Sequence, residues 1–317
     1  MIDIVRWRYA FYLLSLLIII PGTIYLLLFG LRLGIDFEGG TFWQIQFEKP
    51  VRIEDVRSAL AQAGYNEAFV QSFGQQSNTA QGTVTRGVSM RLPEIKENST
   101  EKAKLEQILK SRFGNYEELV FTSVGPAVGR EIRNRSIVAI ALASLGILGY
   151  IAFAFRKVSH PFRYGICAII AMLHDVLVVV GIFAILGKHF GVEIDALFVT
   201  ALLTVIGFSV HDTIVVFDRI RENQLRRYGE SFEQIVNISL LQTLVRSVNT
   251  SMTVIFTLLA LYFFGGTTIK HFVLALLIGI VSGTYSSIFN ASLLLVSWEN
   301  KDFLRIFRRA EPEAAAT

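Results

Sequence analysis

The chain is built mainly from long apolar runs. A helix needs about 20 mostly apolar residues to cross the roughly 30 Å hydrocarbon core of a bilayer, and six runs are of about that length. We place them at 11–30, 136–155, 164–186, 194–217, 248–264 and 272–298. The first follows Arg6 and Arg8 but is longer than the apolar core of a signal peptide and lacks a small-residue cleavage site, so we interpret it as an uncleaved anchor. The pattern predicts a polytopic α-helical membrane protein with six transmembrane helices.

A different pattern fills residues 31–135. Alternating apolar and polar positions predict half-buried strands, and apolar positions three and four residues apart predict helices. The predicted order is strand 42–48, helix 53–63, strands 68–74 and 87–92, helix 100–113 and strand 118–124. We interpret the Gly, Gln, Asn, Ser and Thr residues between the two middle strands as a long flexible turn. This βαββαβ order fits a small ferredoxin-like α+β domain that serves as a binding or contact module.

Composition agrees with this organisation. Hydrophobic residues make up 52% of the chain and charged residues only 18%, against about 25% charged in a typical soluble domain. A soluble globule is therefore excluded. The net charge of +4 does not require a nucleic-acid partner, because the basic residues gather beside the spans. The single Cys167 lies inside the third run, so it forms no intramolecular disulfide and we expect it to serve packing.

Lys and Arg residues beside the spans predict the orientation. One side of the predicted membrane carries only Lys188 and Lys270 in short segments, whereas the other side carries Arg6, Arg8, Arg156, Lys157, Arg163, Arg219, Arg221, Arg226, Arg227, Arg246, Lys301, Arg305, Arg308 and Arg309. The positive-inside rule places both termini in the cytoplasm. The predicted parts are the N-terminus with helix one (1–30), the extracytoplasmic domain (31–135), helices two to six (136–298) and a cytoplasmic tail (299–317).

Carboxylates inside two spans are the first candidates for function. A carboxylate in the middle of a transmembrane helix costs about 2.5–3.5 kcal/mol and is seldom present without a partner or a role. Span three contains His174 and Asp175, and span four contains His211 and Asp212. Asp212 precedes the interfacial Asp218 by about 9 Å of helix. We expect Asp212 to couple helix movement to the membrane potential by gaining and losing a proton, whereas His174 satisfying Asp175 is an equal alternative to function.

Span five is unusually hydroxylated where it enters the membrane. Arg246, Asn249, Thr250 and Thr253 follow i, i+3, i+4, i+7 spacing and so form one stripe. Thr250 and Thr253 lie about 6–10 Å below Arg246, at a depth like that of Asp212. We expect this stripe to supply partners for Asp212. The alternative is that the hydroxyls only join helices, at about 0.6–2 kcal/mol each.

Two further features are interpreted as structural. Span six carries Gly279, Ser282, Gly283 and Ser286 at small-xxx-small spacing, which predicts a close helix contact face and no catalytic feature. The basic segment 219–235 is amphipathic. We interpret it as a helix lying along the anionic cytoplasmic leaflet, with a specific partner site as the alternative.

Four stretches, in order over nearly the whole chain, resemble the motifs of a known family. They are 34–40 (GIDFEGG), 206–222 (IGFSVHDTIVVFDRIRE), 246–253 (RSVNTSMT) and 278–288 (IGIVSGTYSSI). These motifs are similar to those of SecF in the SecD/SecF family, whose paired membrane subunits belong to the bacterial protein-export machinery and are related to the RND transporters. The DTIVVFDRIRE string is specific.

The resemblance implies a non-enzymatic, accessory role in secretion across the cytoplasmic (inner) membrane. The membrane part would take up protons, and the external domain would help to draw an emerging polypeptide across after the ATP-driven step. By this resemblance Asp212 is the proton-carrying acid, with Arg246 and Thr250 as its basic and hydroxyl partners. The residues that match the family motif after helix one are Gly34, Asp36, Phe37, Gly39 and Gly40.

The chain departs from the family pattern at two positions. His211 stands where Asn is usual before the acid, and Ser247 stands where Thr is common after the Arg. A His beside the acid would titrate near neutral pH. We favour the alternative, a neutral His211 that acts as an Asn-like hydrogen-bond donor.

Six spans make one half of an RND-like machine, so we predict an obligate SecD-like membrane subunit as partner. The Sec translocon channel, the exported unfolded polypeptide and membrane lipids are the other expected partners, with protons as the coupling ion and no metal or other cofactor. Two alternatives stay open. An RND-type exporter of small molecules or lipids would need more residues outside the membrane than 31–135 supply, and a structural scaffold of a translocase would leave Asp212 dispensable.

Overall fold

A computed structural model describes residues 3–79, 82–156, 161–226 and 229–302. The chain forms two compact units, of which one is Leu33–Ile137 and the other joins Met1–Arg32 to Val138–Thr317. Of the predicted tail, residues 303–317 lie outside the described part.

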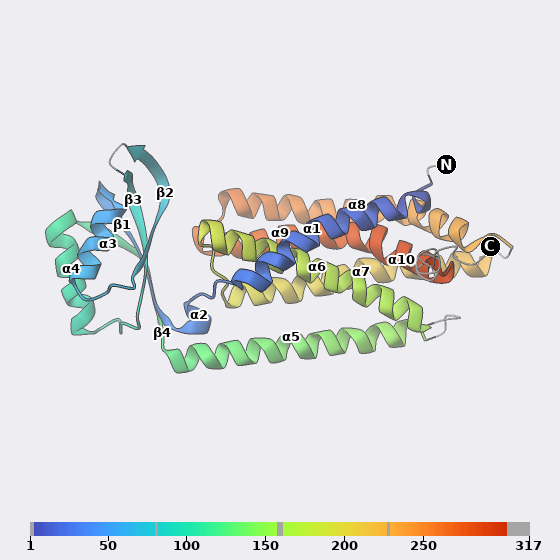
Figure 1. Ribbon diagram of the computed structural model, residues 1–317, viewed down its shortest axis with the longest axis horizontal. Helices are drawn as coiled ribbons and strands as arrows, with labels where there is room; N and C mark the ends of the chain where they lie inside the picture. The colour runs from blue at the N-terminus through green and yellow to red at the C-terminus, as the bar shows by residue number, and fades with distance from the viewer. Residues whose placement is uncertain (1–2, 80–81, 157–160, 227–228, 303–317) are drawn as a thin grey trace, which may run out of the picture. The chain divides into compact units, whose positions relative to one another are not determined.

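Six helices in the described part are long and apolar enough to cross a membrane, which confirms the predicted fold class (Figure 1). The first is α1 (Arg8–Phe29), preceded by the short η1 (Val5–Trp7). The next four are α5 (Pro126–Ala154), α6 (Pro161–Phe190), α7 (Ala196–Arg226) and α8 (Phe232–Phe264). After η2 (Thr267–Ile269), the sixth consists of α9 (Lys270–Tyr285), the π-helical η3 (Ser286–Ala291) and α10 (Ser292–Glu299).

The described residues of the segment 219–235, which are 219–226 and 229–235, form no surface helix of their own. Residues up to Arg226 continue α7, and α8 begins at Phe232 behind Ser231. The Ser231 hydroxyl accepts from the Gln234 N–H while the Gln234 side chain accepts from the Ser231 N–H, which is a capping box. The prediction of a separate helix along the leaflet is therefore wrong, because polar residues extend both transmembrane helices beyond their apolar parts.

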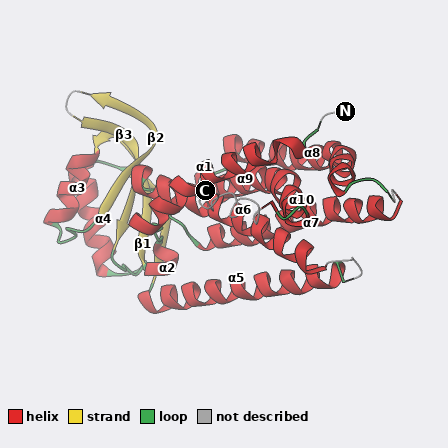
Figure 2. Ribbon diagram, turned by 45° about the vertical axis from the view of Figure 1, so that its right-hand side comes forward, coloured by secondary structure: helices red, strands yellow, loops and turns green. Residues whose placement is uncertain are grey.

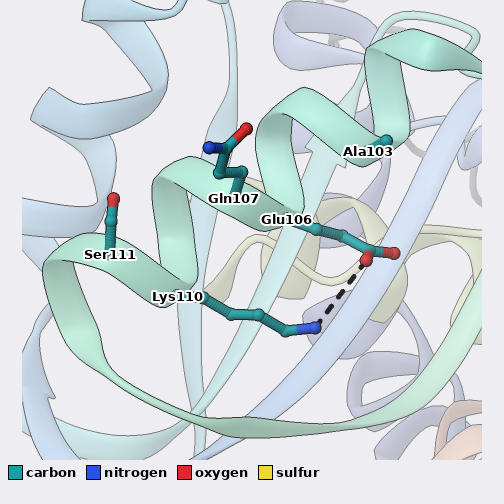
Figure 3. Close-up of a pocket in the computed structure, with 5 residues that line it drawn as sticks. All are labelled: Ala103, Glu106, Gln107, Lys110 and Ser111. Atoms are coloured by element: carbon teal, nitrogen blue, oxygen red, sulfur yellow. Dashed lines mark ion pairs between the residues drawn. The ribbon is translucent and has the colours of Figure 1, made fainter.

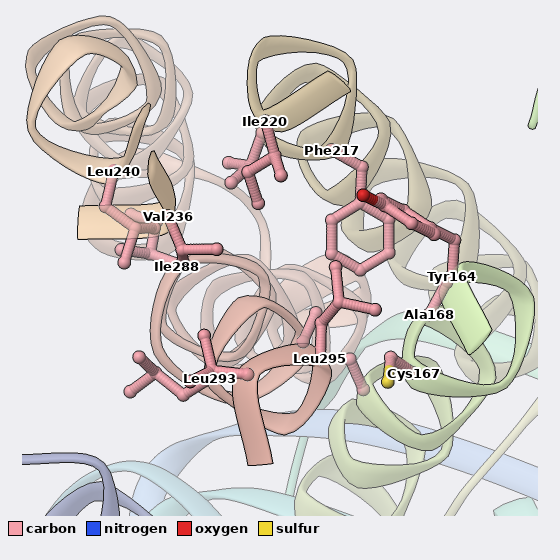
Figure 4. Packing of buried hydrophobic residues seen from close by; sticks show 14 of the residues in the cluster. Tyr164, Cys167, Ala168, Phe217, Ile220, Val236, Leu240, Ile288, Leu293 and Leu295 are labelled. Carbon is pink, nitrogen blue, oxygen red and sulfur yellow. The ribbon is translucent and has the colours of Figure 1, made fainter. Parts of the chain in front are cut away.

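Aromatic and aliphatic side chains fill the interior of the membrane unit (Figure 4). Phe217 of α7 meets Tyr164 of α6 edge to face at a ring separation of 5.1 Å, and Phe155 stacks on Tyr164 at 5.6 Å. Cys167 of α6 is buried beside them and forms no disulfide. Leucine and isoleucine side chains from α8, η3 and α10 complete the cluster. The core therefore joins helices that are far apart in the sequence.

The second unit is a four-stranded antiparallel sheet with two helices on one face (Figure 2). Its strands are β1 (Gly40–Arg52), β2 (Phe69–Thr79), β3 (Gly82–Leu92) and β4 (Tyr116–Val124), in the order β2-β3-β1-β4. Its covering helices are α3 (Ile53–Gln62) and α4 (Thr100–Phe113). The insertion of β3 between β1 and β2 is the split βαβ arrangement. A small α+β domain is thus present, as predicted.

Side chains on one face of the sheet form the core of this domain. Trp43, Ile45 and Phe47 alternate along β1 and are almost fully buried against α3 and α4. Lys102 of α4 reaches into the same core, where its Nζ lies 3.0 Å from Glu118 Oε2 and 3.9 Å from the Phe121 ring. The pairing satisfies a cation whose burial alone would be costly.

The hairpin between the two middle strands is longer than predicted. Pairing of β2 with β3 continues past the bulge after Phe73 through Gln76↔Thr85 to Thr79↔Gly82. The prediction of a long flexible turn is therefore wrong. Ladder hydrogen bonds use backbone groups only, so a polar composition typical of turns does not prevent pairing, and Thr residues suit a strand.

Candidate functional site

Asp212 is a buried carboxylate on α7 without a full set of partners. Only 3% of the residue is exposed, and its Oδ2 has no hydrogen-bond partner among the described residues. Its Oδ1 lies 4.0 Å from Nδ1 of His211, whose side chain is 68% exposed. An unpaired, desolvated carboxylate oxygen is costly unless it gains a proton or a partner. The position therefore suits a group that changes its protonation state.

The stripe on α8 faces away from the other helices. Arg246, Asn249, Thr250 and Thr253 are all exposed. The Thr250 hydroxyl donates to the Arg246 carbonyl at 2.9 Å, and that of Thr253 donates to the Thr250 carbonyl at 2.7 Å. Arg246 is close enough to Asp212 to interact electrostatically. No hydrogen bond joins the stripe to Asp212 Oδ2 in the described part, so this arrangement does not bring the two into contact.

Asp175 lies at the centre of a second polar cluster. It is fully buried on α6 and accepts hydrogen bonds from three serine hydroxyls. Ser282 donates to Oδ1 at 2.7 Å, while Ser209 and Ser286 donate to Oδ2 at 2.6 Å each. His174 Nδ1 lies 2.9 Å from Oδ1. We call these five residues the Asp175 cluster; it joins α6, α7, α9 and η3.

Sequence reasoning identified the two acidic centres but missed the three serines. His174 does contact Asp175, as one alternative held, but it supplies one of four contacts. The sequence pattern assigns Ser282 and Ser286 to a packing face, but both donate to Asp175, so span six does more than pack. Their spacing of four residues places them on one face of a helix, so the sequence does contain a signal that these two serines act together. Nothing local in the sequence indicates that Ser209 belongs with them.

Glycines let span six approach α7 closely. A Cβ atom added to Gly279 would overlap the side chain of Val205. A Cβ added to Gly283 would lie 3.3 Å from Ser209 Cβ and 3.6 Å from Asp175 Oδ2. Gly283 therefore borders the Asp175 cluster, and both glycines permit the close approach of α9 to α7.

We expect Gly279→Ala to destabilise the membrane unit by about 1–3 kcal/mol, because the new methyl group overpacks the α7–α9 contact. Gly146→Ala is the matched control, since a Cβ added to Gly146 on α5 meets nothing within 4 Å. Both changes bring the helix-propensity gain of alanine, of about 1 kcal/mol, so their difference isolates the overlap. Thermal unfolding of the purified chain in detergent measures it, and equal melting temperatures would contradict the expectation.

The motif after helix one forms a compact corner within the α+β unit. Gly34 precedes a single helical turn, α2 (Ile35–Glu38), which the sequence did not predict. Phe37 is buried there, and Asp36 is half-buried. Gly39 and Gly40 follow with φ of 83° and 115°, values that favour glycine.

Neighbouring backbone leaves no room for side chains at this corner. A Cβ added to Gly39 would lie 2.8 Å from Pro126 Cα, and one added to Gly40 would lie 2.7 Å from the Leu92 carbonyl oxygen. Arg91 closes the corner by donating to the Leu33 carbonyl at 2.8 Å and to Glu38 Oε2 at 2.6 Å. The motif is therefore a junction between β1, β3 and the start of α5.

The described residues contain neither an enclosed pocket on α4 nor a group arranged to bind a metal ion. The side chains around a hollow on α4 are Ala103, Glu106, Gln107, Lys110 and Ser111, with Lys110 Nζ 3.9 Å from Glu106 Oε2 (Figure 3). All five belong to one helix, so the hollow is open and not an enclosed site. Within the ranges that the structure describes, no group of three or more His, Cys, Asp or Glu residues is arranged to hold a metal ion.

Two family models match the chain. One, described as protein export membrane protein SecD/SecF, C-terminal, matches residues 104–301. The other, described as the SecD/SecF GG motif, matches residues 24–51, which include the corner around Gly39 and Gly40. The first match covers more than half of the 317 residues.

Individual relatives agree with the family models. The protein translocase subunit SecF of Thermobaculum terrenum is 99% identical over 317 residues, 100% of both chains. That of Anaerolinea thermophila is 44% identical over 321 aligned residues, again 100% of both. The subunit SecDF of Bacillus subtilis is 33% identical over 303 residues, which are 95% of this chain but 38% of that protein.

A solved structure shares the fold. The crystal structure of SecDF, a translocon-associated membrane protein from Thermus thermophilus, matches with a TM-score of 0.80 and 33% identity. The match covers 94% of this chain and 39% of the SecDF chain, so this chain spans well under half of that protein. The motifs, the fold and the relatives agree, and the chain belongs to the SecF branch of the SecD/SecF family of protein-export membrane proteins.

Proposed function

We propose that this translocase subunit uses the proton-motive force, together with a SecD-like partner, to promote late steps of polypeptide export across the cytoplasmic membrane. The observation that carries the proposal is the unpaired Oδ2 of the buried Asp212. A group so placed binds a proton more readily than it tolerates an uncompensated charge. Movement of one charge through 100 mV is worth about 2.3 kcal/mol, which is enough to bias a helix movement.

In this proposal Asp212 carries the proton. Arg246 stabilises the carboxylate when the proton leaves, and Thr250 offers a hydroxyl partner at the same level of α8. His211, Asn249 and Thr253 surround this path as supporting polar residues. Their exposure on the described chain supports the idea that a rearrangement or a partner brings them to the acid.

A SecD-like partner explains the polar face on α7 and α8. We define this face by its exposed residues, which are Thr200, Thr204, His211, Arg246, Asn249, Thr250 and Thr253. The threonines bond to carbonyls of their own helices, but a guanidinium and an imidazole facing lipid would be costly. The SecDF relatives, of which this chain matches 38% and 39%, support a partner that covers this face.

We expect a thiol-reactive photocrosslinker, attached to a cysteine introduced at position 253, to link this chain to SecD in membranes that contain both proteins. The change is Thr253→Cys in a Cys167→Ala background, which removes the only native thiol. Leu145→Cys is the matched control, because Leu145 is 63% exposed on α5 among apolar side chains that suit lipid. Crosslinks measured by gel shift should form at residue 253 and not at residue 145; the reverse pattern would refute the proposed interface.

The chain is proposed to lie in the cytoplasmic membrane in one fixed orientation. The distribution of Lys and Arg supports cytoplasmic termini and an extracytoplasmic α+β unit. The Sec translocon channel and the exported, unfolded polypeptide are the proposed protein partners, and lipids surround the apolar helices. Membership of a protein-export family leaves the small-molecule exporter without a supporting observation.

Preprotein export measured with Asp212→Asn tests the proton-coupling proposal. A purely structural scaffold predicts that this variant exports normally, so the same measurement decides between the two. The proposal fails if export by the variant still responds to the proton-motive force.

A further inference from the structure

The Asp175 cluster contains an imidazole nitrogen that the hydrogen bonds do not use. His174 is only 7% exposed. Its Nδ1 lies 2.9 Å from Asp175 Oδ1, whereas its Nε2 is buried with no hydrogen-bond partner among the described residues. One nitrogen of the ring is therefore held by the carboxylate, and the other is free to bind.

The donors around Asp175 determine which nitrogen carries the proton. Three hydroxyls point at the carboxylate oxygens at 2.6–2.7 Å, as expected for an ionised acceptor. An ionised carboxylate only accepts, so His174 Nδ1 must donate, and Nε2 is then a basic lone pair. The opposite assignment, with a protonated Asp175 donating to Nδ1, would leave an Nε2–H donor buried and unsatisfied, which costs more than an unpaired acceptor.

We propose that His174 and Asp175 form a second proton-binding site of the membrane unit, separate from Asp212. The proton binds the Nε2 lone pair of His174, and the Asp175 carboxylate stabilises the imidazolium through Nδ1–H. One N–H bond forms, one O–H bond of a hydronium ion breaks, and the charge of the pair changes from −1 to 0. Neutralising a net charge inside a membrane protein is favourable.

The groups that face this pair do not supply its missing partner. From α9, the Tyr285 ring lies 6.1 Å from the imidazole, but the Tyr285 hydroxyl donates to the Phe11 carbonyl at 2.7 Å. From α1, the Tyr12 hydroxyl bonds to Ser297 at 3.0 Å.

The remaining packed elements add one ionisable group near the pair. On α7, Asp212 lies three residues from Ser209, while η3 (Ser286–Ala291) contains no ionisable side chain. On α10, Glu299 at the far end of the span pairs with Arg163. Among the buried side-chain atoms of these elements that have no hydrogen-bond partner in the described part of the chain, His174 Nε2 is the only nitrogen.

The cluster also links the charge of the pair to helix packing. Asp175 accepts from serines on α7, α9 and η3, so an imidazolium at His174, which draws the carboxylate charge toward Nδ1–H, weakens the bonds that these serines donate. Charge-assisted hydrogen bonds are roughly twice as strong as neutral ones. Binding at His174 therefore acts on contacts between helices that Asp212 does not touch directly, and the inference does not depend on the proposed role of Asp212.

The site can be tested by nitrogen NMR of the full chain. The chain contains five histidines, which are labelled with ¹⁵N and followed from pH 9 to pH 5 in lipid nanodiscs, with His174→Gln used to assign the signal of residue 174. We expect His174 to hold its proton on Nδ1 at high pH and to become imidazolium within this range. A ring with the proton on Nε2 at high pH, or one that stays neutral throughout, would overturn the proposal without reference to any variant.

Two variants separate this site from the proposed function. In Asp175→Asn the anionic partner is lost, and we expect His174 to lose its titration down to pH 5; an unchanged titration would refute the pair. In Asp212→Asn we expect His174 to titrate as in the parent chain. If His174 no longer titrates in Asp212→Asn, the two acids belong to one shared site and the proposal of a second site is overturned. If only proton-driven export fails its own test, the proposed function fails while the NMR evidence for the second site stands.

Discussion

Asp212→Asn is expected to abolish the stimulation of preprotein export by the proton-motive force. Asn keeps the shape of the side chain but cannot ionise, so the buried group at this position no longer changes charge. One proton moved through 100 mV supplies about 2.3 kcal/mol. A free-energy difference of about 1.4 kcal/mol already changes an equilibrium constant tenfold. We therefore expect the driven component of export to fall more than tenfold. Inverted membrane vesicles containing SecD and the translocon, with a labelled preprotein and an imposed gradient, provide the measurement.

Asp218→Asn is the matched control for this experiment. Asp218 lies on the same helix and its side chain is 57% exposed and 2.7 Å from Arg221, a surface pair that contributes little. Vesicles with the Asp218→Asn variant should export preprotein as those with the parent chain do. Equal losses in both variants would point to a general defect of α7, and full gradient-driven export by Asp212→Asn would leave the scaffold role as the better account.

Gly40→Ala is expected to destabilise the α+β unit by about 2–4 kcal/mol. A side chain at φ of 115° is strained by about 1–3 kcal/mol, and its Cβ would lie 2.7 Å from the Leu92 carbonyl oxygen. That carbonyl belongs to β3, which pairs with β1, so relief of the overlap must separate the two central strands. Hydrogen exchange of the full chain, followed by mass spectrometry, should show faster exchange in β1 and β3.

Gly64→Ala separates strain from overlap. Gly64 also has a positive φ, of 97°, but a Cβ added there meets nothing within 4 Å. We expect it to cost about 1 kcal/mol from backbone strain alone. If Gly40→Ala and Gly64→Ala accelerate exchange equally, the close approach of Gly40 to the Leu92 carbonyl does not contribute to the stability of the unit.

Apolar runs predicted the membrane spans well because a span is defined by its length and its solvent. The same runs predicted the positions of the helix ends poorly. α7 continues to Arg226 and α8 starts at Phe232, since a helix does not stop where its residues become polar. A capping residue such as Ser231 marks the end better than hydropathy does.

In the α+β unit, alternation along β1 is enough to locate the core residues Trp43, Ile45 and Phe47 from the sequence. The hairpin of β2 and β3 was underestimated because the residues near its tip have the composition of a loop. Strand pairing there is decided by backbone hydrogen bonds and by the partner strand, neither of which a single segment reveals.

The candidate sites also combine features that a single segment reveals with features that only the packed helices reveal. A carboxylate inside an apolar run stands out at once, so both Asp175 and Asp212 could be found from the sequence. Their partners could not, because Ser209 and Ser282 come together with Asp175 only when three helices pack. The direction in which the Arg246 stripe faces is likewise a property of the assembled bundle.

The π-helical η3 changes how the last span must be compared with its relatives. A π-type bond spans one residue more than an α-type bond, and each residue turns an α-helix by about 100°. Residues after Ala291 are therefore rotated relative to a regular continuation of α9. A helical wheel drawn for the whole of 270–299 mixes two faces, and superposition on a relative with an uninterrupted helix would require a one-residue gap within Ser286–Ala291.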